Sequence, residues 1–296
     1  LRTTLGTNVI NQRLDNYNGI DLQYISSTGN AVVVNNRFNS WQFENYLTYN
    51  KSWGIHTLNA VAGVAWQHID RYEVTARSQT YIDNFYNVNN LGAGAVVQAP
   101  GSFANAYGLQ SYFGRINYTL LNKYLLTFTG RQDGSSKFGS DNRYAFFPSA
   151  AFAWKVNEED FMQDLHAISN LKLRTSYGET GNSEINAYLA DEIMGNYEVI
   201  FGGARAIGIG ISRMGNPGLK WEKVRQIDFG VELGLFENRI NIEFDWYRKR
   251  AMDMLLSAPV PRSSGYNEVS MNIGSMENKG VELALNTVNI RGKNFT

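Results

Sequence analysis

The chain of 296 residues carries 27 basic and 27 acidic side chains, so its formal net charge is zero, and it contains no cysteine. A balanced charge offers no basic surface for nucleic acid, and a chain without cysteine has neither disulfides nor thiolate metal sites. Aromatic residues make up 13% of the sequence and 28 glycines stand against 5 prolines, which is typical of β-strands joined by many turns. No apolar run approaches the roughly 20 residues that a transmembrane helix needs.

Alternation of apolar and polar residues predicts ten β-strands, because successive side chains of a strand point to opposite faces. The expected strands, in chain order, are 2–10, 41–50, 55–71, 107–120, 124–132, 147–156, 171–179, 226–235, 240–247 and 280–289. One short helix is expected within 157–170, where Asn157 can cap an acidic first turn and apolar residues recur at helical spacing.

Short and long connections alternate without exception between the predicted strands. The short ones are expected at 51–54, 121–123, 157–170 and 236–239, and the long ones at 11–40, 72–105, 133–144, 180–220 and 253–279. In a meander that crosses a membrane, every second connection lies on the same side, so this rule is typical of an outer-membrane barrel. A soluble sandwich gives no reason for it. The predicted fold class is an all-β, antiparallel, up-and-down transmembrane β-barrel, present in part with about ten strands.

The clearest alternation lies in the hairpin that turns at 236–239. One face is apolar, with Ile227, Phe229, Val231, Leu233, Leu235, Ile240, Ile242, Phe244 and Trp246. The opposite face carries the carboxylates Asp228, Glu232, Glu243 and Asp245. We expect the first face to contact lipid and the second to line the lumen. Aromatic residues near predicted strand ends fit the interfacial girdles of such barrels, namely Trp41, Tyr49, Trp53, Trp66, Tyr124, Trp154 and Trp246.

The three histidines do not suggest a metal site or a hydrolase. His56 and His68 lie on one predicted strand, about 40 Å apart at the usual rise, and are expected at the membrane interfaces. His166 has no His or Cys partner near it in the sequence. The carboxylates of the lumen face are expected to be balanced by Arg and Lys rather than to form a glycosidase pair. We therefore expect no cofactor and no enzymatic activity.

Four blocks of the sequence carry a family resemblance. They are SYFGRINYTLLNKYLLTFTGRQDGSSKFGSDNRYAFFPSAAFAWKV (111–156), LKLRTSYGETGN (171–182), NPGLKWEKVRQIDFGVELGLFENRINIEFDWYRKRAMDMLL (216–256) and NIGSMENKGVELAL (272–285). In this order they are similar to the signature blocks of the SusC/RagA family of TonB-linked outer-membrane proteins of Bacteroidetes. Residues 1–110 fit the more variable half of that family's barrel.

The resemblance implies a barrel of about twenty-two strands whose lumen holds a plug. It also implies TonB-energised import of glycan fragments or peptides, together with a SusD-like surface lipoprotein that closes over the barrel. Residues 1–296 are then expected to be a partial barrel domain in outer-membrane lipid. The family's plug domain, its TonB box and the rest of its barrel have no counterpart in the sequence.

Candidate substrate-binding residues lie in and around RQDGSSKFG (131–139). The favoured interpretation is that Arg131 and Asp133 pair within the wall and fix the loop, and the alternative is that Asp133, Lys137 and Arg143 face the lumen mouth and contact solute. Aromatic residues of the long loops, of which Trp221 is the strongest candidate, could stack on sugar rings or be buried against a lid protein. The others are Tyr81, Tyr86, Tyr188 and Tyr197.

The function predicted from the sequence is TonB-dependent nutrient import across the outer membrane. An oligosaccharide is the expected substrate, because a wall of mixed charge has no strong preference for a charged solute. The alternatives are import of peptides, import of iron chelates or cobalamin, and a non-transporting surface β-module.

Overall fold

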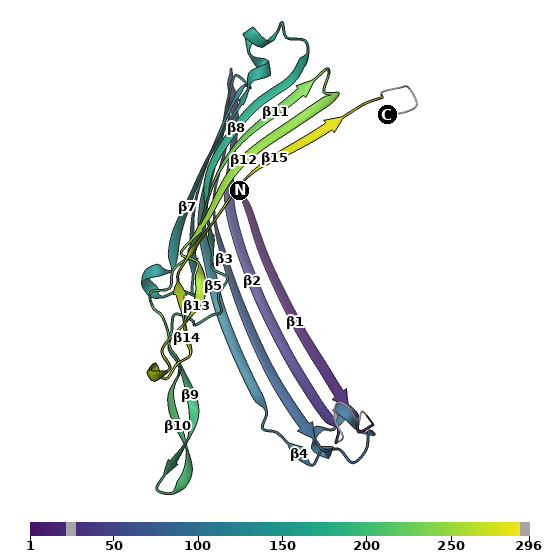
Figure 1. The fold of residues 1–296 in the computed structure, drawn as a ribbon, viewed down its shortest axis with the longest axis vertical. Coiled ribbons are helices and arrows are strands. Elements are labelled where there is room, and N and C mark those ends of the chain that lie inside the picture. The colour runs from purple at the N-terminus through teal and green to yellow at the C-terminus, as the bar shows by residue number, and fades with distance from the viewer. Residues whose placement is uncertain (22–27, 291–296) are drawn as a thin grey trace. The chain divides into compact units, whose positions relative to one another are not determined.

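The computed structural model describes residues 1–21 and 28–290, which form antiparallel β-strands joined by turns and short 3₁₀-helices (Figure 1). Ten strands of the described residues pair in chain order in one sheet, as the sequence predicts. They are β1 (Arg2–Asn18), β2 (Asn30–Trp53), β3 (His56–Gln79), β5 (Gly101–Leu120), β6 (Tyr124–Ser135), β7 (Tyr144–Lys155), β8 (Ile168–Asn182), β11 (Glu222–Leu235), β12 (Ile240–Met252) and β15 (Ser275–Thr287). The short strand β4 (Val96–Val97) pairs with β3 off this path.

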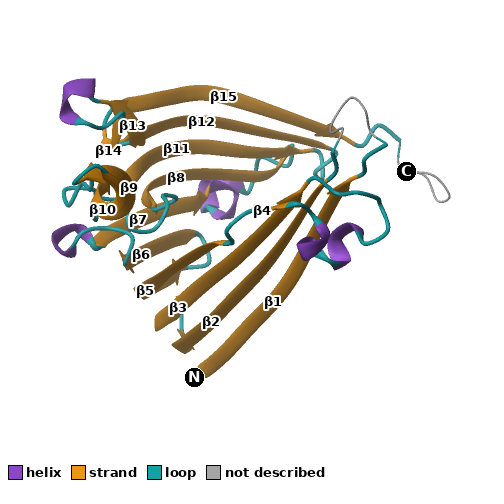
Figure 2. Cartoon of the chain, turned by 90° about the horizontal axis from the view of Figure 1, so that it is seen from below, coloured by secondary structure: helices purple, strands orange, loops and turns teal. Residues whose placement is uncertain are grey.

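The chain divides into two compact units. Unit 1 comprises residues 1–3, 44–65 and 109–296, and unit 2 comprises residues 4–43 and 66–108. In unit 1 the strands β8, β11, β12 and β15 lie side by side (Figure 2). Unit 2 contains the loop-side portions of β1, β2, β3 and β5 together with β4 and the helices η1 (Asn87–Asn89) and η2 (Leu91–Ala93).

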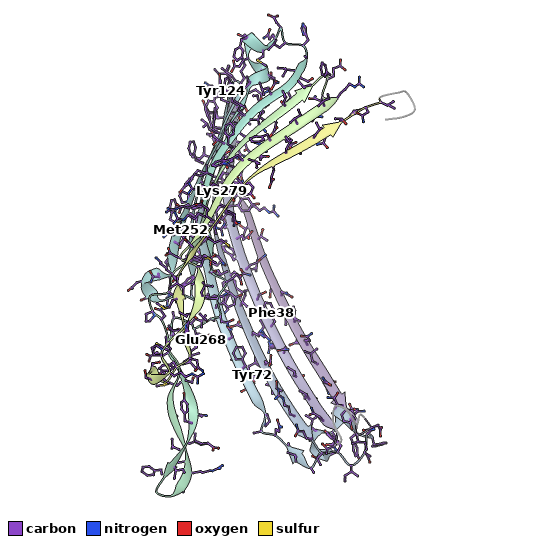
Figure 3. All side chains as sticks on the ribbon, in the orientation of Figure 1. Phe38, Tyr72, Tyr124, Met252, Glu268 and Lys279 are labelled. Atoms are coloured by element: carbon purple, nitrogen blue, oxygen red, sulfur yellow. The ribbon has the colours of Figure 1, made fainter. Side chains whose placement is uncertain are left out.

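The alternation of short and long connections is present in unit 1. Its short turns gather at one end, marked by Tyr124, and its long connections at the other, marked by Glu268 (Figure 3). The turn at 236–239 is confirmed, with Phe236, Glu237 and Asn238 in the left-handed region and the Arg239 N–H donating to the Phe236 carbonyl at 3.2 Å. Consecutive left-handed residues reverse the chain tightly enough to join neighbouring strands.

Two long connections of unit 1 contain hairpins that the sequence analysis treats as loop. Strands β9 (Ile193–Phe201) and β10 (Ala204–Arg213) pair with each other, as do β13 (Leu255–Pro259) and β14 (Glu268–Asn272). The strand predicted at 280–289 also begins earlier, at Ser275. The short helix η3 (Ser140–Asn142) lies between β6 and β7, and η6 (Arg262–Ser264) lies between β13 and β14.

The prediction that 11–40 and 72–105 are irregular is wrong where strands extend into these segments. Strand β1 continues to Asn18, β2 already begins at Asn30, and β3 continues to Gln79. The extensions of β1 and β2 carry polar residues on both faces, so apolar alternation is lost there, whereas in β3 Tyr72, Val74 and Ala76 still alternate with polar residues. Backbone pairing does not require such alternation, and the strands therefore continue.

The helix predicted within 157–170 is replaced by two single turns, η4 (Val156–Glu158) and η5 (Asp160–Met162). The apolar residues at helical spacing have nothing to pack against, since Phe161 is 66% exposed and Leu165 is 48% exposed. A short helix is marginal in water without such packing, which explains why the cap signal does not extend into an α-helix.

Candidate functional site

The register of β11 and β12 confirms that the hairpin has one apolar and one polar face. Phe229 lies opposite Trp246 and Val231 opposite Phe244, whereas Glu232 lies opposite Glu243 on the other face. The predicted partition of the side chains between two faces is therefore correct. The polar face is the candidate functional surface, because side chains with donors, acceptors and charges gather there.

An array of ion pairs runs across three strands of this polar face. The Lys172 ammonium lies 3.1 Å from Glu232, and Arg174 reaches both Glu232 (Nε to Oε1, 3.2 Å) and Asp245 (Nη2 to Oδ2, 2.7 Å). The neighbouring carboxylate, Asp228, accepts hydrogen bonds from Ser176 at 3.0 Å and from Gln226. Glu232 and Asp245 thus compensate Lys172 and Arg174, while Asp228 is held by neutral donors, so the array is polar and leaves neither cation unpaired.

The candidate Asp133 is held by its neighbour in β6. The Arg131 Nε donates to both carboxylate oxygens of Asp133, at 2.7 and 2.8 Å, and its Nη2 donates to Ser111 Oγ at 2.8 Å. The same guanidinium lies over the Phe113 ring, 5.5 Å from its centroid. The predicted pairing of Arg131 with Asp133 is confirmed, and it fixes the point at which β6 enters its loop.

The candidates Lys137 and Trp221 are buried in unit 1, and the exposed Arg143 joins Trp221 through its backbone carbonyl. Lys137 is 7% exposed and its ammonium donates to the Ser183 carbonyl at 3.4 Å. The Arg143 carbonyl accepts from the Trp221 indole N–H at 2.9 Å. Trp221 is itself 7% exposed and packs on the rings of Phe138 and Phe147, which completes a core with Leu219. The structure thus brings Arg143 and Trp221 together, and the contact of all three residues with substrate stays a prediction.

The other loop aromatics differ in how much of their surface is exposed to solvent. Tyr81 is buried, at 6% exposure, whereas Tyr86, Tyr188 and Tyr197 are between 42% and 47% exposed. The Tyr197 hydroxyl donates to the Ile211 carbonyl at 2.9 Å, which ties it to the β9–β10 hairpin. Of these four tyrosines, Tyr86 has an exposed ring next to another exposed aromatic residue, Phe85.

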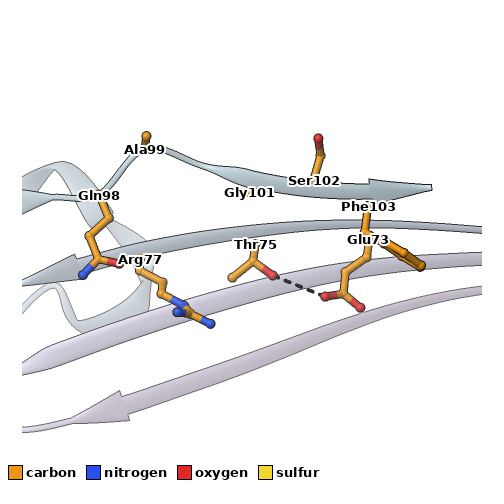
Figure 4. Close-up of a pocket in the computed structure, with 8 residues that line it drawn as sticks. All are labelled: Glu73, Thr75, Arg77, Gln98, Ala99, Gly101, Ser102 and Phe103. Atoms are coloured by element: carbon orange, nitrogen blue, oxygen red, sulfur yellow. Dashed lines mark hydrogen bonds between the residues drawn. The ribbon is translucent and has the colours of Figure 1, made fainter. Parts of the chain in front are cut away.

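Sequence reasoning missed a cavity in unit 2. It is lined by Glu73, Thr75 and Arg77 of β3 and by Gln98 and Phe103 near the start of β5, and the Thr75 hydroxyl lies 3.5 Å from the Glu73 carboxylate (Figure 4). These residues fall in the segment that the sequence analysis takes for a loop. The alternation of Glu73, Thr75 and Arg77 is a strand signal, although it is a polar one.

Two of the histidines pack on aromatic rings, and their expected place at the membrane interfaces stays a prediction. His56 stacks between the rings of Trp53 and Tyr118 and its Nδ1 lies 2.7 Å from the Tyr118 hydroxyl. His68 stacks on Trp41 at 6.1 Å. Among residues 1–21 and 28–290, no three His, Cys, Asp or Glu side chains lie close enough to hold a metal ion. The same residues contain no helix long and apolar enough to cross a membrane.

Comparisons with known proteins agree with this geometry. A family model described as TonB dependent receptor-like, beta-barrel matches residues 2–296. TonB-dependent receptor P3 of Formosa agariphila is 40% identical over 253 residues, which cover 86% of this chain and 25% of that protein. TonB-dependent receptor SusC of Bacteroides thetaiotaomicron is 35% identical over 274 residues, which cover 90% of this chain and 26% of that protein.

Solved structures give the same match. A chain of the RagAB peptide transporter superposes with a TM-score of 0.88 at 31% identity, over 98% of this chain and 32% of that chain. The copper transporter OprC shares the fold alone, with a TM-score of 0.52 at 13% identity. The chain therefore spans about a quarter of the length of the curated relatives it matches.

Proposed function

The chain belongs to the TonB-dependent receptor β-barrel family of the outer membrane, and from this premise we propose that it forms part of the wall of an oligosaccharide importer of SusC type. A member of this family is not an enzyme. The observation that carries the proposal is that both cations of the polar array, Lys172 and Arg174, are compensated by Glu232 and Asp245. A phosphate-rich ligand would require clustered, uncompensated Arg and Lys.

Import of peptides is the second candidate. It is favoured by the match to a chain of the RagAB peptide transporter, which is 31% identical over 98% of this chain. A polar wall whose Lys172 and Arg174 are ion-paired suits a neutral peptide as well as a glycan, because both offer hydrogen-bonding groups without a net charge.

Growth of a strain that lacks the complete receptor separates the candidates. The strain is supplied in turn with single oligosaccharides, with peptides, and with iron chelates or cobalamin as limiting nutrients. We expect growth to fail on an oligosaccharide and to return when the gene is restored. If every oligosaccharide still supports growth and only another nutrient class fails, the glycan assignment is wrong.

The β9–β10 hairpin supports a partner on the loop side of unit 1. Ile207 and Ile209 share a face of β10 and are each 76% exposed, and Ile200 of β9 is 80% exposed on the same face. A two-stranded hairpin is marginally stable alone, and exposed apolar patches mark contact surfaces. We propose that this face contacts a SusD-like lipoprotein that closes over the barrel.

Co-purification of the lipoprotein with the complete receptor tests this contact. Ile207→Asp and Ile209→Asp are expected to lower the amount of lipoprotein recovered, because each replaces an exposed isoleucine with a charge. The same face also carries the Arg205–Glu198 ion pair. Ala206→Asp is the matched control, since residue 206 is on the opposite face of the same strand. Equal recovery from all three variants would place the lipoprotein elsewhere.

The TonB motor of the inner membrane is proposed to drive import, so uptake should be lost in a strain without TonB. The residues proposed to contact solute are Asp133, Lys137, Arg143 and Trp221. Their packing in unit 1 supports a role in holding the β6–β7 loop beside the solute path.

A further inference from the structure

A second cavity in unit 2 is lined by residues of four consecutive strands. Its volume is about 400 Å³. The lining residues that matter here are Gln12 of β1, Asn36 and Phe38 of β2, Arg71 of β3, and Asn105 and Tyr107 of β5. Phe38 is labelled on its strand in Figure 3. Three side-chain amides and two aromatic rings therefore converge on one hollow of the wall.

Two of these amides hold buried oxygens that bond to nothing in the described residues. The side-chain oxygens of Asn36 and Asn105 are inaccessible to solvent and have no hydrogen-bond partner within residues 1–21 and 28–290. Buried polar atoms in proteins are almost always satisfied, so a pair of unsatisfied acceptors beside one cavity calls for a donor. Neither oxygen is committed to a partner in the wall, so each amide can turn toward the cavity and accept a hydrogen bond from a ligand there.

The charge around the cavity offers an anionic ligand no uncompensated partner on this face, because the Arg37 side chain bonds to Asn39 on the other face of β2. The Arg71 guanidinium is paired with Glu73, with 3.1 Å between Nη2 and Oε2, so it is already compensated. A neutral ligand with many hydroxyl groups fits the remaining chemistry, because each hydroxyl both donates and accepts while the apolar face of a sugar ring stacks on an aromatic ring. Phe38 and Tyr107 supply such rings.

The position along the strands places the cavity outside the hydrocarbon layer. Trp41 stacks on His68 and Phe43 lies against Trp66, which marks an aromatic girdle in unit 2. Continuous strand runs from Trp53, at the turn end of β2, to Trp41. This stretch measures roughly 40 Å, the length that a strand tilted by about 40° needs to cross about 30 Å of hydrocarbon. Asn36 and Phe38 lie on the loop side of Trp41, where solutes arrive from water.

The cavity shown in Figure 4 follows farther along β3. Along β3, Arg71 is followed on the same face by Glu73, Thr75 and Arg77, which line the cavity of Figure 4. Two hollows in succession along one strand form a track for a ligand made of repeated units. A single small molecule would need only one of them.

We propose that Asn36, Phe38, Asn105 and Tyr107 form a subsite for a neutral sugar residue in the loop-side part of the wall. The subsite rests on the proposed import of oligosaccharides and names residues that select the substrate. The Asn36 and Asn105 oxygens accept hydrogen bonds from sugar hydroxyls, and the two rings hold the apolar face of the sugar.

The test is calorimetric titration of the complete receptor in detergent with neutral hexasaccharides. The probes are β-1,4-glucan, β-1,3-glucan, α-1,4-glucan, β-1,4-xylan and β-1,4-mannan hexasaccharides. For a probe that binds the wild type, the double variant Asn36→Ala/Asn105→Ala is expected to raise Kd at least tenfold with an unchanged Tm, since these oxygens bond to nothing in the wall. Phe38→Ala is expected to weaken binding, and Phe38→Tyr to retain it.

Asn117→Ala is the matched control. Asn117 donates to Asn59 Oδ1 at 3.0 Å and accepts from the Thr127 hydroxyl at 2.9 Å, so its amide is already satisfied. It is expected to lower Tm and leave Kd unchanged. If the wild type binds no hexasaccharide, the proposed substrate class fails. If the wild type binds and the double variant keeps its Kd, with or without a lower Tm, the subsite is wrong and the import proposal stands.

Discussion

Arg174 of β8 and Asp245 of β12 form an ion pair across the strand that separates them, with 2.7 Å between Nη2 and Oδ2. That strand is β11, and its residue in register with both is Gly230. A Cβ added to Gly230 would lie 2.6 Å from Asp245 Oδ1 and 2.7 Å from Arg174 Nε. The two charged side chains therefore meet in space that only glycine leaves open.

Gly230→Ala is expected to destabilise the receptor by about 1 kcal/mol, because the new methyl group displaces a partly exposed ion pair. Urea unfolding of the detergent-solubilised receptor measures the change. The matched control is Gly178→Ala on the same polar face, where a Cβ would lie at 3.4 Å from the Ser149 Cβ and displaces no ion pair. Equal losses in the two variants would contradict the assigned role of Gly230.

Val231→Arg tests the apolar face of the hairpin. Val231 pairs with Phe244 on β12 and with Leu173 on β8, so an arginine there would enter a row of apolar side chains. We expect a cost of about 2–4 kcal/mol if the residue lies near the bilayer midplane. Unfolding from lipid vesicles measures it. Ala284→Arg, on the polar face of β15 opposite Glu243, is expected to cost much less.

The sequence predicts the strands best where one face meets an apolar medium and the other does not. Around Val231 the alternation is strict, and register, turn and facing all agree with it. Between Asn30 and Trp41 both faces of β2 carry polar residues, and the strand gives no alternating signal although its backbone is paired. Periodicity reports a difference between two faces, so it fails where the faces are alike.

The prediction of the candidate site residues from sequence is limited in a different way. The pairing of Arg131 with Asp133 is local, two residues apart on one strand, and the sequence predicts it. The packing of Trp221 on Phe138 joins residues far apart in the chain, and no local pattern contains it. The unsatisfied amides of Asn36 and Asn105 come from strands that the sequence analysis assigns to loops, so no local signal brings them together.

Trypsin added to whole cells tests the sidedness of the connections. Arg205, next to the tip of the β9–β10 hairpin, is 84% exposed at its side chain and is expected to be cleaved in cells that lack the lipoprotein proposed to cover this hairpin. Arg239, in the turn between β11 and β12, is expected to be protected until the cells are broken. Peptide mass mapping identifies both sites. Cleavage at Arg239 in intact cells would reverse the proposed topology, and Arg205→Gln controls for the identity of the first cut.

Trp221→Ala is expected to destabilise the receptor by about 3–5 kcal/mol, because it empties the centre of a buried cluster. Trp221→Phe keeps the aromatic contacts with Phe138 and Phe147 but loses the hydrogen bond to the Arg143 carbonyl, and should cost about 1 kcal/mol. Urea unfolding measures both. A substrate contact, if Trp221 also makes one, would show as a loss of uptake by Trp221→Phe larger than its loss of stability explains.

Glu159, in the short connection between β7 and β8, makes stability depend on acid pH. Hydrogen bonds from the Tyr124 hydroxyl at 2.6 Å, the Trp154 indole at 2.9 Å and the Lys123 ammonium at 3.2 Å hold the pKa of its carboxyl below the ordinary value of 4.5. A lowered pKa in the folded state means that the unfolded state takes up the proton first as pH falls. The stabilisation is therefore fully present above pH 4.5 and is lost as pH falls through the folded-state pKa.

Melting of the wild type and of Glu159→Gln across this range provides the measurement. Above pH 4.5 the variant should melt at a lower temperature, because a neutral amide accepts weaker hydrogen bonds than a carboxylate. Below the folded-state pKa the two curves should converge. Asp160→Asn is the matched control, since the Asp160 side chain is 94% exposed and lies 3.9 Å from the same Lys123. If Asp160→Asn removes the acid dependence and Glu159→Gln keeps it, the hydrogen-bonded carboxylate is not its cause.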